Sequence, residues 1–272
     1  MSVTPDSLTM AAAWIAAADS LIITAGAGMG IDSGLPDFRG PRGFWGVYPA
    51  LGQRQMHFAD IANPAAFRTV PRLAWGFYGH RLALYRNTSP HAGFSVLKRW
   101  ADTKPHGAFV YTSNVDGHFQ RAGFSEDRII ECHGSIHYLQ CLSPCSRRIH
   151  DAASLDVSID ADACQWRGPL PTCPDCGSVA RPNILMFDDW EWLPQRVQEQ
   201  QAHYRAWPGR QPVVIELGAG TAIPGVRRFG ESLDAPLIRI NPHEPETKRP
   251  QAVGLPMGAL EALQAIDRLL AG

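Results

Sequence analysis

The sequence predicts an α/β protein built on a Rossmann-like parallel sheet, and three observations lead to this prediction. First, an apolar run at residues 21–23 is followed directly by a loop with alternating glycines. Second, short apolar runs rich in β-branched residues recur along the chain, which is typical of strands buried on both faces of a parallel sheet. Third, stretches with helical character precede the first run and follow the last, at residues 5–19 and 258–270. The further strands are expected at residues 108–112, 128–131, 212–217, 236–240 and 252–255.

Two stretches interrupt this pattern and predict a second, smaller domain. Residues 41–104 are rich in aromatic side chains and predict helices with no strand between them. Residues 136–185 hold two cysteine pairs among prolines and polar residues, as a zinc-binding module does. We therefore expect a helical insert and a zinc module that together form the small domain. The Rossmann-like domain is then expected to comprise residues 1–40, 105–135 and 186–272.

Length, charge and cysteine usage narrow the class of protein. The 272 residues suffice for one large domain with inserts. A formal net charge of −1 argues against bulk electrostatic binding to nucleic acid or to a membrane surface. No apolar run approaches the roughly 18 residues of a membrane span, and the N-terminus does not resemble a leader. We therefore expect a cytoplasmic protein, in which six cysteines favour metal binding or free thiols over disulfides.

The loop after the first strand carries the strongest functional signal. Gly26, Gly28 and Gly30 alternate, and the missing Cβ atoms let a backbone lie against a ligand. A helix that begins just after them would direct free N–H groups at a phosphate. The segment 37–39, Asp-Phe-Arg, adds charge and an aromatic ring that a plain nucleotide loop does not need. The loop therefore predicts a site that binds a dinucleotide and acts on it.

The two cysteine pairs predict a metal site. Cys141 and Cys145 form one pair, and Cys173 and Cys176 form the other. Two thiolate pairs on tight turns suit a tetrahedral zinc ion, and four protein ligands leave no open position for catalysis. The first pair has one residue more than the usual spacing, so four ordinary cysteines in a loop-rich insert are the alternative.

Taken together, four blocks of the chain resemble the sirtuins, the NAD-dependent protein deacylases. Residues 26–39 are similar to the family's glycine block with its SGIPDFR ending, and residues 112–117, Thr-Ser-Asn-Val-Asp-Gly, to its TQNVDG block. Residues 131–135, Glu-Cys-His-Gly-Ser, are similar to the block with the family's histidine, and the cysteine pairs follow as in sirtuins. The order of the blocks covers nearly the whole chain.

The resemblance implies NAD as co-substrate, acyl-lysine proteins as partners and one structural zinc ion. His133 is the implied base that takes a proton from a ribose hydroxyl, and a histidine titrates near working pH. Asn114 would position the ribose or a water and Asp116 would bind the nicotinamide amide, although both are also common turn residues. The implied cofactor-binding residues are Gly26, Ala27, Gly28, Asp37, Phe38, Arg39, Ser113, Asn114, Asp116, Gly218, Ala219, Gly220 and Asn241.

One helical motif suggests a preference among acyl groups. Tyr78 and Arg81 stand three residues apart, which places them on one helix face. A phenol and a guanidinium could clamp a carboxylate, and the pair resembles the Tyr-x-x-Arg of desuccinylase-type sirtuins. Succinyl- and malonyl-lysine are then plausible substrates. The alternative is an aromatic helix that packs in a core beside a solvated arginine.

Several positions depart from the family pattern and leave other functions open. Gly30 replaces a serine, Ser113 a glutamine, and the 218–220 segment a Gly-Thr-Ser loop. Residues 187–189 replace a Phe-Gly-Glu-like turn next to the segment expected to pair with an acyl-lysine peptide. A mono-ADP-ribosyltransferase or NAD hydrolase, and a non-catalytic NAD-sensing module, are the alternatives to a deacylase. A generic dehydrogenase is disfavoured because Ile31 stands where its third glycine belongs.

Overall fold

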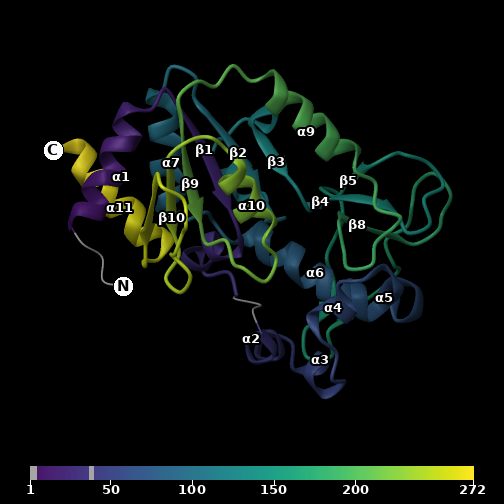
Figure 1. Ribbon diagram of the computed structural model, residues 1–272. Coiled ribbons are helices and arrows are strands. Elements are labelled where there is room, and N and C mark those ends of the chain that lie inside the picture. The colour runs from purple at the N-terminus through teal and green to yellow at the C-terminus, as the bar shows by residue number, and fades with distance from the viewer. Residues whose placement is uncertain (1–4, 37–39) are drawn as a thin grey trace.

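A six-stranded parallel sheet forms the centre of the computed structural model, which describes residues 5–36 and 40–272 (Figure 1). All its neighbouring strands pair in parallel, in the order β11-β10-β9-β1-β2-β3. The α/β prediction is therefore confirmed. The strands are β1 (Ser20–Ala25), β2 (Ala108–Thr112), β3 (Ile129–Glu131), β9 (Pro212–Leu217), β10 (Leu237–Ile240) and β11 (Ala252–Leu255).

The order of the strands places a ligand site by topology. Strands β2 and β3 lie on one side of the central strand β1, and the later strands β9, β10 and β11 lie on the other side. This is the order of dinucleotide-binding sheets, in which ligands bind at the carboxyl ends of the strands where the order reverses. In this chain the reversal lies between β1 and β9.

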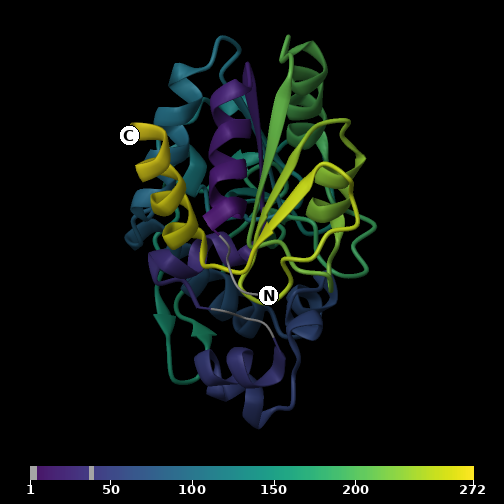
Figure 2. The ribbon, with the colours of Figure 1, turned by 60° about the vertical axis from the view of Figure 1, so that its left-hand side comes forward.

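Helices cover both faces of the sheet, which explains the nearly continuous apolar runs of its strands. On one face α1 (Pro5–Ala17), α7 (Ala92–Thr103) and α11 (Ala259–Ala271) share a core with Leu21 and Ile23. The other face, toward which Ile22 points, is covered by helices α9 (Gln195–Ala206) and α10 (Gly225–Ser232) (Figure 2). Alternate β1 side chains thus enter opposite cores.

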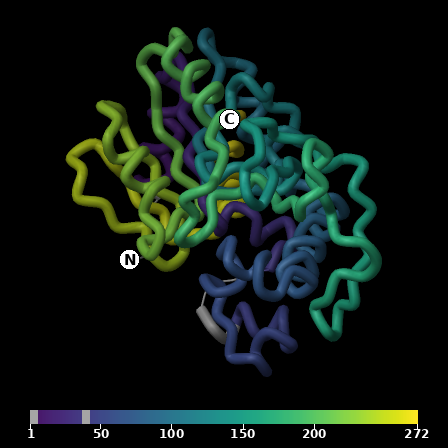
Figure 3. The backbone as a smooth tube through the Cα atoms, turned by 90° about the vertical axis from the view of Figure 1, so that its right-hand side faces the viewer, coloured from purple at the N-terminus to yellow at the C-terminus, as the bar shows by residue number. Residues whose placement is uncertain are grey.

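The small domain joins the helical insert to the cysteine-bearing segment. Aromatic side chains of α6 share one core with Ile136 and Trp166, and Figure 3 shows the two segments side by side. The helical insert and the cysteine-bearing segment thus pack together in this structure. Its helices are α2 (Gly40–Val47), α3 (Pro49–Gln53), α4 (Phe58–Ile61), α5 (Pro64–Thr69) and α6 (Pro71–Asn87); its strands are β4 (Gly134–Cys141), β5 (His150–Asp151), β6 (Ile159–Asp160), β7 (Gln165–Trp166) and β8 (Ala180–Ile184).

Two features differ from the sequence-based expectation. The segment 136–185 is more regular than a loop-rich insert, because β4 pairs antiparallel with both β5 and β8. Helix α7 lies within the expected insert 41–104, yet Phe94, Leu97 and Trp100 pack in the core of the large domain. By packing, the helical insert therefore ends before α7. Short helical turns complete the fold: η1 (Ala27–Ser33), α8 (His118–Arg121) and η2 (Glu126–Arg128).

Among the residues described, no helix has both the length and the apolar character needed to cross a membrane.

Candidate functional site

Two glycine loops meet at the point where the strand order reverses. The N–H of Gly28 donates to the carbonyl of Gly218 at 3.0 Å, and that of Gly26 donates to Leu217 at 3.0 Å. A Cβ on Gly26 would lie 2.8 Å from Cα of Ala219. Gly218 has φ +59°, and a Cβ there would lie 2.4 Å from Cα of Gly28. These glycines are therefore required by the contact between the two loops, whatever ligand lies above them.

The turn after the first glycine corrects the expectation of a helix with free N–H groups. The segment η1 (Ala27–Ser33) is a 3₁₀ helix. The N–H of Gly28 is already used by Gly218, and the N–H of Met29 donates to the carbonyl of Gly26 at 3.0 Å. These two N–H groups are bonded within the protein. A phosphate would therefore have to be held by other groups of the loop.

Two further expectations concern this loop. A Cβ on Gly30 would lie 2.9 Å from Cδ1 of Leu35, so the family's serine would need this flexible side chain to move. The predicted nicotinamide-side residues Asp37, Phe38 and Arg39 lie outside the described residues.

The start of the loop after β2 is hydrogen-bonded to the first glycine loop. The hydroxyl of Thr112 donates to the carbonyl of Ala25 at 3.0 Å and accepts from the N–H of Asn114 at 3.0 Å. The Nδ2 of Asn114 donates to the carbonyl of Gly26 at 3.0 Å, and the N–H of Ser113 donates to Ala25 at 3.1 Å. The structure therefore brings Ser113 and Asn114 together with Gly26 and Ala25.

His133 lies two residues beyond the end of β3 and is half-buried. Burial lowers the pKa of its imidazole below the ordinary 6.5, and a hydrogen bond with the backbone of Ser113 opposes this shift. The ring is therefore neutral at pH 7 and can accept a proton. Its backbone is fixed by the next residue, because a Cβ on Gly134, at φ +78°, would lie 2.1 Å from the carbonyl oxygen of Asn183.

Asp116 is buried and its carboxylate has a structural partner. Its Oδ1 accepts from the backbone N–H of His118 at 2.9 Å, at the start of α8. Its backbone carbonyl accepts from Nε2 of His137 at 2.9 Å. These bonds hold the loop that follows Asn114 in one conformation.

Asn241 is buried behind the second glycine loop. Its Nδ2 donates to the carbonyl of Ala219 at 2.9 Å, while its Oδ1 accepts from the N–H groups of His243 and Glu244, both at 3.0 Å. An amide engaged in this way positions the loop 218–220 by its backbone. Gly220 at the end of this loop is only partly buried.

Two supporting residues were missed from the sequence. Arg227 of α10 donates from Nε to the carbonyl of Ala219 at 3.0 Å. Glu244 accepts from the N–H of Thr221 at 3.0 Å and from its hydroxyl at 2.6 Å. Neither residue has a local sequence signal, because each meets the loop only through the tertiary fold.

The structure brings Tyr78 and Arg81 together inside the small domain. Tyr78 is 1% exposed and stacks on Phe67 at 5.5 Å, and burial raises the pKa of its phenol to about 12. Arg81 is 8% exposed, so the alternative of a solvated arginine is wrong. Its Nε and Nη2 donate to Oη of Tyr85 at 3.0 and 2.8 Å. Tyr85, one helical turn after Arg81, was not singled out from the sequence.

The four predicted cysteine ligands converge at the end of β4. The Sγ atoms of Cys141 and Cys176 lie 3.7 Å apart, as do those of Cys145 and Cys173, and all four atoms lie within 4.8 Å of one another. Four sulfurs at about 2.3 Å from a tetrahedral zinc would be separated by about 3.8 Å, so the donor set fits one closed zinc site.

Asp175, which lies between Cys173 and Cys176, links the second cysteine pair to the loop that follows the first pair. Asp175 accepts from the hydroxyl of Ser146 at 2.8 Å and from Nη1 of Arg148 at 2.9 Å. Its Oδ2 also lies 3.6 Å from Nε2 of His150. These contacts hold the two cysteine-bearing loops together, and they were not predicted from the sequence.

Comparison with known proteins agrees with this geometry. A family model described as the Sir2 family matches residues 26–210. A protein of Pseudomonas aeruginosa named NAD-dependent protein deacylase 1 is 31% identical over 87% of this chain and 88% of its own. A protein of Fusarium oxysporum f. sp. cubense named probable bifunctional ADP-ribose hydrolase/ADP-ribosyltransferase is 30% identical over 82% of this chain but 39% of its own. The solved structure of a mutant Sir2 homologue with ADP-ribose has a TM-score of 0.68 at 25% identity, over 99% of this chain and 97% of its own. With its sheet order, its histidine block and its cysteine quartet, this chain belongs to the Sir2 family.

Proposed function

We propose that this protein is an NAD-dependent protein-lysine deacylase that releases nicotinamide and O-acyl-ADP-ribose. The observation that carries the proposal is the half-buried imidazole of His133, whose pKa is lowered and which bonds to the backbone of Ser113. Through Asn114 this group belongs to the same cluster as Gly26 of the first glycine loop. A neutral base thus stands beside the proposed NAD site.

The proposed reaction gives each of these groups a task. The acyl-lysine oxygen attacks the anomeric carbon of the nicotinamide ribose as nicotinamide leaves. Because this oxygen is a poor nucleophile, the ribose must be held in near-attack geometry. We assign that positioning to Asn114 and the glycine loops. His133 then removes a proton from a ribose hydroxyl.

The burial of Arg81 supports an acidic acyl group as the finer proposal. A guanidinium inside an aromatic core, with Phe77, Tyr78 and Tyr85 rings 5.3 to 5.7 Å from its Cζ, suits a carboxylate at the end of an acyl chain. Succinyl- and malonyl-lysine each carry such a terminal carboxylate. In this proposal Tyr85 fixes the plane of the guanidinium.

The protein part of the substrate has an available strand edge. Strand β8 lies at the edge of its three-stranded sheet, and the N–H of Leu185, the next residue, donates to the carbonyl of His133 at 2.9 Å. An extended peptide could pair with this segment as an added strand.

The test offers acetyl-, malonyl- and succinyl-lysine peptides together with NAD, and NAD alone. We expect nicotinamide release that requires an acyl peptide, stops in His133→Ala and is faster for succinyl than for acetyl. Nicotinamide release without peptide, or ADP-ribose attached to a protein acceptor, would instead support the transferase or hydrolase alternative. The succinyl preference should disappear in Arg81→Met while acetyl turnover remains.

A further inference from the structure

The segment after β8 exposes an unusual amount of apolar surface. Leu185, Phe187 and Trp190 are 38%, 39% and 95% exposed, and they make up three of the seven large exposed hydrophobic side chains in the described part of the chain. The segment begins beside the candidate base, because the N–H of Leu185 donates to the carbonyl of His133 at 2.9 Å. An exposed run that starts at a reaction centre indicates a surface that binds a partner.

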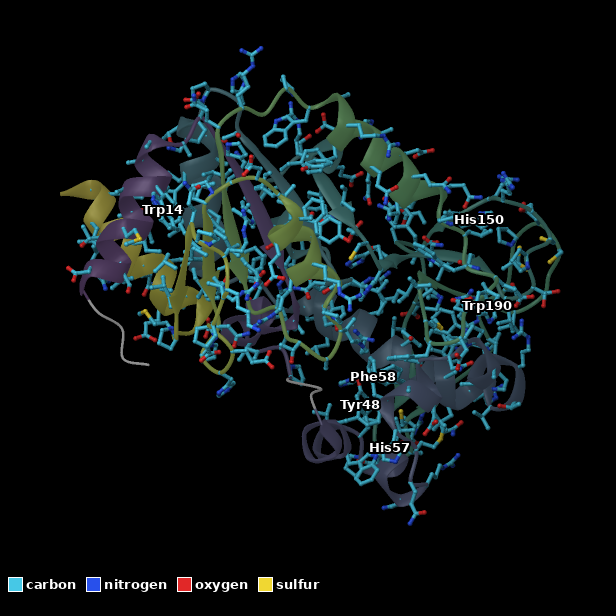
Figure 4. The ribbon with its side chains drawn as sticks, viewed as in Figure 1. Trp14, Tyr48, His57, Phe58, His150 and Trp190 are labelled. Atoms are coloured by element: carbon cyan, nitrogen blue, oxygen red, sulfur yellow. The ribbon has the colours of Figure 1, made fainter. Side chains whose placement is uncertain are left out.

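This segment is held against helix α5 at both ends. Asp188 accepts from Nδ2 of Asn63, the N-cap residue of α5, at 3.4 Å. Glu191 pairs with Arg68 near the end of the same helix. Trp190 lies between these two anchors and points to solvent, in the small domain and far from Trp14 (Figure 4). Its indole is therefore presented by a fixed backbone.

Asp188 has a left-handed backbone conformation that glycine adopts more easily than aspartate. Its φ of +51° lies in the left-handed region, which glycine enters without strain. An aspartate here puts a carboxylate two residues before the exposed indole. Observed strain of this kind motivates a search for what the side chain does.

The local charges leave a net negative site. Asp189 is neutralised by the buried guanidinium of Arg181 at 2.7 Å, and Glu191 is neutralised by Arg68. The carboxylate of the exposed Asp188 contacts the uncharged amide of Asn63. An unneutralised carboxylate two residues before an exposed indole suits a cation that can stack on the ring and pair with the carboxylate.

We propose that Asp188 and Trp190 form a subsite for a basic side chain, arginine above all, that flanks the acyl-lysine of the substrate protein. The guanidinium would stack on the indole and pair with the carboxylate. The inference rests on the proposed deacylase function, because the segment is taken as the peptide-binding edge. It adds a preference in the protein part of the substrate, separate from the acyl group.

The test measures binding and turnover of matched peptides with one acyl-lysine. Each peptide carries arginine, alanine or glutamate at one position up to five residues before or after the lysine. We expect arginine at one of these positions to lower Kd about tenfold relative to alanine, and glutamate to raise it. The advantage should shrink as salt is raised from 50 to 500 mM, because the site is exposed.

Variants then assign the effect to the two side chains. Trp190→Ala and Asp188→Asn should each reduce the arginine advantage to about threefold or less, while Kd for the alanine peptide stays unchanged. Leu269→Ala, an exposed apolar position on α11, serves as the matched control and should change nothing. Asp188→Gly should lose the preference while resisting denaturant better than the parent protein, which excludes misfolding as the cause.

The outcomes separate this proposal from the deacylase proposal. Equal affinity for the arginine and alanine peptides at every position, or a preference that survives both substitutions, would overturn the subsite. Arginine-selective binding that depends on Asp188 and Trp190, without any acyl-dependent nicotinamide release, would keep the subsite and refute the deacylase.

Discussion

The glycine loops of the large domain and the cysteine cluster of the small domain both join distant segments, but through different forces. Gly28 and Gly218 meet through a direct backbone hydrogen bond, made possible by absent side chains. The four thiolates of the cysteine cluster would repel one another without a cation between them. The backbone of the protein itself therefore holds the proposed NAD edge together, whereas the zinc module needs its ion.

Removal of zinc tests the second half of this comparison and should have the largest effect. Structural zinc contributes roughly 10 kcal/mol or more in small zinc-binding folds. We expect a chelator, or Cys173→Ser, to abolish hydrogen-exchange protection of β4 and β8, which flank the cluster. The parallel sheet should keep its protection. Persistent protection of β4 in metal-free protein would contradict the expectation.

Gly218→Ala tests the loop contact and should have the next largest effect. The new Cβ would meet the backbone of Gly28 at 2.4 Å in a left-handed residue, so we expect a loss of about 3 kcal/mol in the free energy of unfolding. Gly220→Ala is the control, because the nearest atom to its Cβ is a side-chain oxygen at 3.7 Å. Denaturant titration of both variants gives the difference, and equal stability would show that the loops can separate freely.

Asn241→Ala should cost less, because it removes hydrogen bonds without a clash. The carbonyl of Ala219 and two N–H groups would lose their partner, at a cost of about 1 to 3 kcal/mol. Asn241→Asp keeps the two acceptor contacts and should recover part of this loss. If neither variant changes the unfolding midpoint, Asn241 does not support the loop.

Acidification should have the smallest effect of the four. Burial lowers the pKa of His80, His91, His118 and His133 below 6.5 in the folded protein. The unfolded chain then binds more protons below pH 6.5, so stability is full above this value and declines as pH falls. Denaturant titrations between pH 7.5 and 5 check the slope, and the acid limb of kcat/KM should lie below 6.5. A midpoint that rises on acidification would contradict this sign.

Local patterns were enough to predict most elements of the large domain. The strand runs, the glycine loops and the carboxyl-edge placement of His133 follow from residue type and from the geometry of parallel sheets. The cysteine quartet was equally visible, because ligand spacing is a local property. The roles of the predicted cofactor residues remain predictions.

Contacts between distant segments were not predictable in the same way. The pairing of β4 with β5 and β8 joins strands whose own sequences carry little signal. Helix α7 follows α6 closely in the chain, yet its apolar face packs in the core of the large domain. Tyr85 becomes relevant only because Arg81 turns toward it inside the aromatic core.

The family, the parallel sheet and the residue types that can carry the chemistry could be read from the amino-acid sequence, because they depend on local pattern and spacing. The contacts of those residues became visible in the folded structure. There, Gly26 and Gly218 allow one glycine loop to pack directly on the other, and Arg81 is buried. Trp190 is exposed to solvent between two residues that contact α5. Burial, close approach and exposure result from the whole chain folding on itself, so no local stretch of sequence specifies them.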